Sequence, residues 1–123
     1  MTEELKDITQ DLASNLHQFT GTENWYMHPF NRNMTYTDGV KYFAEVAGAY
    51  WFIDIVATEV FPLQKLEPFI TLTLTVNDNK AVIEATDGNE HKLWHKPIPF
   101  TDCPSGEWKF YFIDHILLLH SEY

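Results

Sequence analysis

The sequence is poor in cysteine and in basic residues, and no uninterrupted apolar run is long enough to cross a membrane. Its 123 residues contain one cysteine, Cys103, so no internal disulfide can form and a reducing, cytoplasmic compartment is expected. The longest apolar stretch, residues 37–61, is interrupted by charged side chains such as Asp54. Each of these charges opposes insertion into lipid by a few kcal/mol. We therefore expect no membrane span.

Basic residues are outnumbered by acidic ones. Eight Lys and Arg stand against 18 Asp and Glu, which gives a formal net charge of −10. The acids are spread along the chain and form no acidic tail. Direct binding to nucleic acid or to an anionic membrane is therefore disfavoured, because both need a basic surface. An acidic surface that meets a basic protein partner remains compatible with this charge.

Motifs for catalysis and for metal binding are also missing. The sequence has no HExxH, GxSxG or phosphate-binding loop pattern. Cys103 follows Asp102, and an adjacent acid raises a thiol pKa, which opposes nucleophilic reactivity. A metal site assembled from His28, Asp54 and His115 is an open alternative to surface histidines. We expect no catalytic residue, no metal and no cofactor.

Periodicity predicts a single α+β domain over residues 1–123. An amphipathic first helix is expected over residues 2–19 and a central, buried helix over residues 37–61, which is apolar nearly all round. From residue 69 the period changes to two, which predicts four or five strands in an antiparallel meander. Residues 107–120 fit two strands, with a C-terminal helix as the alternative. The two helices are expected to pack on the sheet.

Residues 22–36 show neither helical nor strand periodicity, which predicts a loop, and this loop is rich in large side chains. Trp25, Tyr26, His28 and Phe30 lie in it. One interpretation is that the loop folds over the core as a lid. The other is a binding surface, because loops and aromatic side chains carry function disproportionately often.

Asp54 is the unusual residue of the central helix, since its neighbours are apolar on both sides. A buried carboxylate must be paired or hydrogen-bonded. It is either a satisfied acid, bonded to donors of the aromatic loop or placed at the exposed helix edge, or a ligand-binding group. With Trp51 it completes the candidate binding site, which comprises Trp25, Tyr26, His28, Phe30, Trp51 and Asp54.

Several short motifs resemble a family of small bacterial proteins classed as a domain of unknown function, which occurs in bacteria and in phage or plasmid sequences. They are TGTE at residues 20–23, TDG at 37–39, AYW at 49–51 with Asp54, and SEY at 121–123. Where the family often has proline before the serine, this chain has His120. The resemblance covers residues 19–123. It implies a stand-alone cytoplasmic protein of mobile-element origin and brings no catalytic residue.

Three functions are compatible with these observations. The first is a non-catalytic protein that acts by contact with another protein. The second is a small-molecule or nucleotide-binding domain that uses residues 24–36 and Asp54. The third is an enzyme, for which the sequence offers no constellation. The apolar central helix and the short sheet also predict a homodimer.

Overall fold

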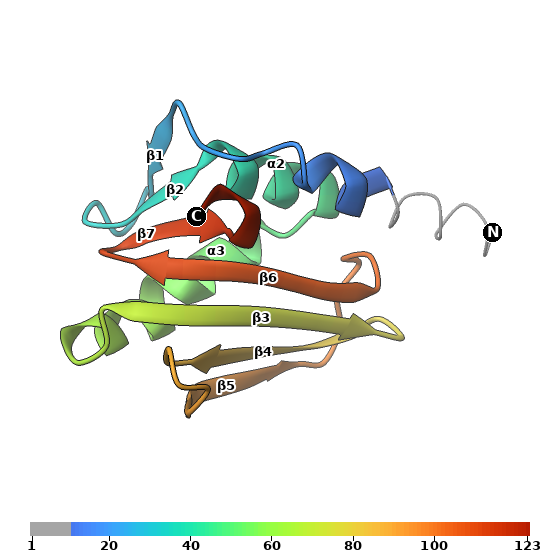
Figure 1. The fold of residues 1–123 in the computed structure, drawn as a ribbon. Coiled ribbons are helices and arrows are strands. Elements are labelled where there is room, and N and C mark those ends of the chain that lie inside the picture. The colour runs from blue at the N-terminus through green and yellow to red at the C-terminus, as the bar shows by residue number, and fades with distance from the viewer. Residues whose placement is uncertain (1–10) are drawn as a thin grey trace.

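The computed structural model describes residues 11–123 and has helices on one face of a seven-stranded sheet (Figure 1). Of the first helix predicted over residues 2–19, residues 11–16 are helical, and residues 2–10 lie outside the described part of the chain. The strands are β1 (Trp25–Met27), β2 (Thr35–Thr37), β3 (Phe69–Asn77), β4 (Lys80–Thr86), β5 (Lys92–Ile98), β6 (Gly106–Ile113) and β7 (Ile116–Leu119). The helical elements are α2 (Asp38–Ala47), α3 (Tyr50–Ile55), the π turn η1 (Val56–Val60) and the 3₁₀ turns η2 (Phe61–Lys65) and η3 (His120–Glu122). The predicted α+β class is confirmed.

The sheet is mixed and larger than the predicted meander of four or five strands. Its order is β1-β2-β7-β6-β3-β4-β5, and β2 runs parallel to β7 while the other pairs are antiparallel. The chain leaves β5 and returns to the far side of β3, so β6 pairs with β3 and not with β5. β1 and β2 are three residues each, too short for a period of two to mark them. The expectation of a plain loop over residues 22–36 is therefore wrong.

The central helix is broken, so the prediction of one helix over residues 37–61 is also wrong. Gly48 adopts the left-handed conformation, with φ 64° and ψ 40°, which glycine reaches without steric cost and which ends helices. Its N–H and that of Ala49 both donate to the carbonyl of Ala44. After α3 the chain widens into η1 and tightens into η2, where Pro62 stands at the start. No helix within residues 11–123 is long and apolar enough to cross a membrane.

The C-terminal segment forms strands, as the favoured interpretation of residues 107–120 had it. β6 and β7 are joined by a two-residue turn at Asp114 and His115, with φ of 50° and 65°. The turn between β3 and β4 at Asp78 and Asn79 is of the same kind, since two successive positive φ angles match the twist of a hairpin. Short polar turns therefore connect these strand pairs.

The core lies between the helices and one face of the sheet. Alternate residues of β3 point into it, and Ile70, Leu72 and Leu74 are fully buried. Phe52 of α3 packs on Phe110 of β6 with ring centroids 4.7 Å apart. In Figure 1 α3 lies behind the strands, and none of the described helices lies on the viewer's side of the sheet between β3 and β5.

Candidate functional site

The six predicted site residues do not converge on one cavity. Trp25 and Tyr26 are neighbours in a strand, so their side chains lie on opposite faces of the sheet. Trp25 is 55% exposed, whereas the hydroxyl of Tyr26 donates to Asp38 at 2.9 Å on the helix side. Trp51 is partly buried against Phe52, with ring centroids 6.4 Å apart. The structure thus separates Trp25 and Tyr26.

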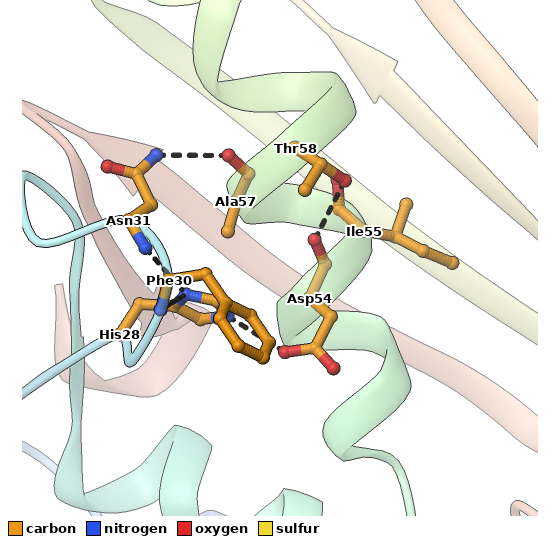
Figure 2. A network of polar contacts seen from close by, with 7 residues as sticks. All are labelled: His28, Phe30, Asn31, Asp54, Ile55, Ala57 and Thr58. Atoms are coloured by element: carbon orange, nitrogen blue, oxygen red, sulfur yellow. Dashed lines mark hydrogen bonds and ion pairs between the residues drawn. The ribbon is translucent and has the colours of Figure 1, made fainter.

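His28, Phe30 and Asp54 do lie together, as Figure 2 shows. His28 is 1% exposed, and its Nε2 lies 2.8 Å from Oδ1 of Asp54. The Nδ1 atom accepts the backbone N–H groups of Phe30 and Asn31, both at 3.1 Å. Nδ1 therefore carries no proton, and Nε2–H donates to the carboxylate. Phe30 covers the imidazole edge-on and is 82% exposed.

This arrangement is better suited to holding two segments of the fold together than to catalysis. The lone pair that a general base would use is occupied by two backbone donors. The carboxylate is the outer member of the pair, with the Asp54 side chain 54% exposed. His28 thereby joins the segment after β1 to the helical segment that contains α3.

A second hydrogen bond from the segment after β1, made by Asn31, explains how the π turn η1 is tolerated. Phe61 donates its N–H to Val56, one residue earlier than the α-helical pattern would have it, and Pro62 has no N–H to offer. The carbonyl of Ala57 therefore has no donor from the next turn, and Nδ2 of Asn31 supplies one at 3.0 Å (Figure 2). π turns of this kind are frequent at functional sites.

The N-terminus of α2 holds a denser network around Asp38. Its carboxylate accepts the hydroxyl of Tyr26, the hydroxyl of Thr22 and the backbone N–H groups of Glu23 and Asn24, at 2.9–3.2 Å. The Tyr26 hydroxyl, followed by these backbone donors, lowers the pKa of Asp38 to about 2. The same bond raises the pKa of Tyr26. Asp38 thus fixes the segment before β1 to α2.

Glu122, near the C-terminus of the chain, is bonded to the same N-terminal end of α2. Its Oε1 accepts the hydroxyl of Thr37 at 2.6 Å and the N–H of Leu119 at 2.9 Å, while Oε2 accepts the N–H of Gly39 at 3.2 Å. A Cβ on Gly39 would lie 2.7 Å from Oε1 and 2.5 Å from Cδ1 of Leu119, so any side chain there would displace Leu119 and Glu122. Thr37 in turn accepts the N–H of Val40 as the N-cap.

The face of the sheet opposite the helices carries a group of apolar side chains near β1. The registers of β1, β2, β7, β6 and β3 place them on one side. We call this group the outer patch; it comprises Trp25, Met27, Phe69, Tyr111, Ile113, Ile116, Leu118 and Tyr123. Tyr123 is 75% exposed and its ring lies 5.2 Å from that of Tyr111 and 5.6 Å from that of Phe69.

A groove of about 330 Å³ runs through the outer patch and includes Trp25, Ile116, Leu118 and Tyr123 in its lining. Sequence reasoning had included Trp25 of these and missed the rest. The apolar run at residues 116–119 could have revealed them, because a strand that is apolar on both faces must have both faces covered. Here the inward side chains of Leu117 and Leu119 are buried and the outward ones remain at the surface.

Other candidate groups do not form reactive sites. Within residues 11–123 no three His, Cys, Asp or Glu side chains lie close enough to hold a metal ion, and His115 packs instead on the ring of Phe61, at 4.4 Å. Burial raises the pKa of the Cys103 thiol to about 12. Desolvation, and not the neighbouring Asp102, is therefore what suppresses its reactivity.

A sequence model of a family of unknown function, DUF6876, matches residues 10–123. The chain belongs to the DUF6876 family. No curated protein and no solved structure matches the chain significantly. In this DUF6876 protein, three of the motifs that carried the family resemblance meet at one place. Thr22, the segment Thr37 to Gly39, and Glu122 are all joined at the N-terminus of α2.

Proposed function

We propose that the protein is a non-catalytic binding module that contacts another protein through the outer patch. The supporting observation is the exposure of large apolar side chains on the sheet face that no helix within residues 11–123 covers. Trp25 and Met27 are each 55% exposed and Tyr123 is 75% exposed. Exposed apolar groups gathered in one place mark interaction sites, and aromatic residues and methionine are enriched in protein interfaces.

The polar features of the chain favour contact over chemistry. The imidazole of His28 is engaged by two N–H groups and one carboxylate. The acids at the N-terminus of α2, Asp38 and Glu122, are engaged by backbone and hydroxyl donors. Groups that hold the fold in this way are not available to activate a substrate. Contact with another protein needs only the outer patch.

The small-molecule alternative is supported less well. A wide depression of about 710 Å³ does lie beside α2, and Tyr26, Asp38, Lys41 and Glu45 are among its lining residues. Of the six predicted site residues it holds only Tyr26, whereas Trp25 lines the groove on the other face. An aromatic pair that would sandwich a planar ligand with Asp54 is therefore split between two sides of the sheet.

The homodimer and the mobile-element origin stay predictions. A dimer formed through the outer patches would bring together two chains of net charge −10, whose repulsion weakens with salt. Sedimentation equilibrium at low and high salt tests the dimer, and a monomer at every concentration would refute it. The neighbourhood of the gene tests the mobile-element origin.

Photocrosslinking from the outer patch tests the proposed function. In one variant a photoreactive phenylalanine analogue replaces Trp25. In the matched control the analogue replaces Leu66, which directly follows η2, is 93% exposed and lies outside the outer patch. We expect one cytoplasmic protein to be crosslinked from position 25 and not from position 66. Purified, that protein should bind the wild type and lose at least about ten-fold in affinity with Trp25→Ala. Equal crosslinking from both positions would refute the outer patch as the site.

A further inference from the structure

We propose that the partner binds by adding an extended, basic segment to the free edge of β1, so that the sheet continues into the partner. This inference rests on the proposed function and deepens it, because it names the mode of binding and the chemistry of the bound segment. Strand addition at an exposed edge is a recurrent way to bind peptides, with backbone bonds for affinity and alternate side chains for specificity.

The hydrogen-bond pattern shows which backbone groups face the edge. The N–H of His28 donates to Met34 on β2 at 3.0 Å, so His28 and Tyr26, two residues apart, point their backbone groups toward β2. In an antiparallel pair the intervening residues point theirs away. The N–H and C=O groups of Trp25 and Met27 therefore face outward from the sheet, because β1 is the terminal strand.

The bonds on the other side of β2 agree with this pattern. The N–H of Thr35, which is the register partner of Met27, donates to the carbonyl of His115 at 3.0 Å. Odd-numbered residues of β2 thus turn toward β7, and odd-numbered residues of β1 turn toward the open edge. Trp25 and Met27 offer both their backbone groups to that edge and their side chains to the outer patch.

The opposite edge of the sheet is protected in a way that β1 is not. β5 contains Pro97, which has no N–H to donate, and the exposed Lys92 lies at its start. Proline and lysine on edge strands are devices that prevent pairing with another chain. β1 contains neither residue. Of the two edges, β1 is therefore the one suited to accept a strand.

Charge selects the chemistry of the segment that binds. Asp114, which is exposed, lines the groove beside Trp25 together with Glu122, whose carboxylate is bonded to other groups of the chain. Among the described residues no Lys or Arg lines this groove. Lys41 lies on the other face of β1, over the ring of Tyr26, and forms an ion pair with Glu45. A segment with apolar and basic side chains would complement this groove. A second copy of this chain, at net charge −10, would not.

The alternation of side chains gives the segment a pattern. Residues at every second position would lie beside Trp25 and Met27 and extend the outer patch, because successive side chains of a strand alternate between faces. β1 presents only two residues to the edge, so four backbone hydrogen bonds are the most that it can form. Apolar contact with the outer patch must supply the rest of the affinity.

A random peptide library displayed on phage and selected on the immobilised full chain tests the inference. A parallel selection on the Trp25→Ala/Met27→Ala variant identifies peptides that bind elsewhere. We expect the specific peptides to be rich in Lys or Arg and to alternate with apolar residues. Synthesised with N-methyl groups on the backbone amides that face β1, they should bind at least about ten-fold more weakly, since two backbone hydrogen bonds are lost.

Met27→Pro supplies the reciprocal test on the protein. Proline at position 27 removes an N–H that faces the edge and removes no bond of the β1–β2 ladder. We expect the selected peptides to lose at least about ten-fold in affinity with Met27→Pro and to keep it with the control Met27→Leu. Should Met27→Pro fail to fold, the N-methylated peptides still decide the question.

The outcomes separate this inference from the proposed function. Peptides that tolerate N-methylation on every alternate amide but require Trp25 would overturn strand addition and leave the outer patch as a binding site. Acidic peptides would overturn the basic partner. A dimer that Met27→Pro dissociates would replace the partner with a second copy of the chain. If no peptide distinguishes the wild type from the double variant, both proposals are wrong.

Discussion

The hydroxyl of Thr37 donates to Oε1 of Glu122 at 2.6 Å, although the two residues are 85 positions apart in the chain. The same carboxylate also accepts the N–H groups of Gly39 and Leu119. The first N–H groups of a helix have no partner within it and attract negative charge. Glu122 therefore joins the N-terminus of α2 to the turn that follows β7.

Replacing Glu122 with alanine should destabilise the protein by about 2–3 kcal/mol, because three donors, two of them backbone N–H groups, lose a charged acceptor in a buried place. Urea denaturation followed by tryptophan fluorescence measures the change. Glu107→Ala is the matched control, since Glu107 is exposed and pairs with the exposed Lys109; it should change stability by at most about 0.5 kcal/mol. Equal effects of the two variants would contradict the role given to Glu122.

Gly39→Ala should destabilise the protein, although alanine in a helix is normally about 1 kcal/mol better than glycine. The new Cβ would lie 2.5 Å from Leu119 and 2.7 Å from the Glu122 carboxylate, and such overpacking costs about 1–3 kcal/mol. Thermal denaturation measures the effect. Gly88→Ala, where nothing lies within 4 Å of the added carbon, is the control and should be close to neutral. A stabilising Gly39→Ala would show that the helix end is looser than described.

Asp38 should contribute to the pH dependence of stability below pH 4. Its pKa is about 2 in the folded protein against an ordinary value of 3.8. A depressed folded-state pKa gives stability that is fully present above the ordinary value and is lost as the pH falls from about 4 to about 2. The difference in Tm between wild type and Asp38→Asn should therefore be constant above about pH 5 and shrink between pH 4 and 2.

Tyr26→Phe is the companion variant, because the Tyr26 hydroxyl is the largest cause of the low Asp38 pKa. Its Tm should fall less than that of Asp38→Asn. Its acid-dependent loss of stability should be smaller than in the wild type and complete at a higher pH, because the folded-state pKa of Asp38 would lie closer to its ordinary value. A Tm difference between wild type and Asp38→Asn that stays unchanged down to pH 2 would show that the carboxylate charge does not stabilise this helix end.

β3, β4 and β6 could be predicted from the sequence because alternate residues of each are buried. Ile70, Leu72 and Leu74 alternate with threonines, and β3 lies where that pattern predicts it. The pattern fails for β1 and β2, whose three residues each are held by pairing and not by their own periodicity. It also fails at Gly48, because an apolar run on both sides of a glycine is compatible with one helix or with two.

The candidate site could be predicted only in part, since it depends on contacts between distant segments. The sequence singled out Asp54 and the aromatic segment around His28, and the structure joins them by one hydrogen bond. The outer patch could not be derived in the same way. It requires the parallel pairing of Thr35 with Ile116, and nothing local to either residue specifies that register.

His28 and Asp54 should differ in their importance for stability. His28→Ala would leave the N–H groups of Phe30 and Asn31 without an acceptor and open a cavity at a buried position, a loss of about 2–4 kcal/mol. Asp54→Asn should be close to neutral, because its side-chain oxygen can still accept from Nε2–H and the side chain is 54% exposed. Urea denaturation of the two variants measures the difference.

The same two variants decide whether Asp54 has any role besides holding His28. If Asp54→Asn retains both stability and binding of the crosslinked partner, the residue serves as an outer hydrogen-bond acceptor and nothing more. If it retains stability but loses the partner, the exposed carboxylate belongs to a second contact surface on the helix side of β1. A loss of stability as large as that of His28→Ala would mean instead that the hydrogen bond from Nε2–H depends on the charge of Asp54.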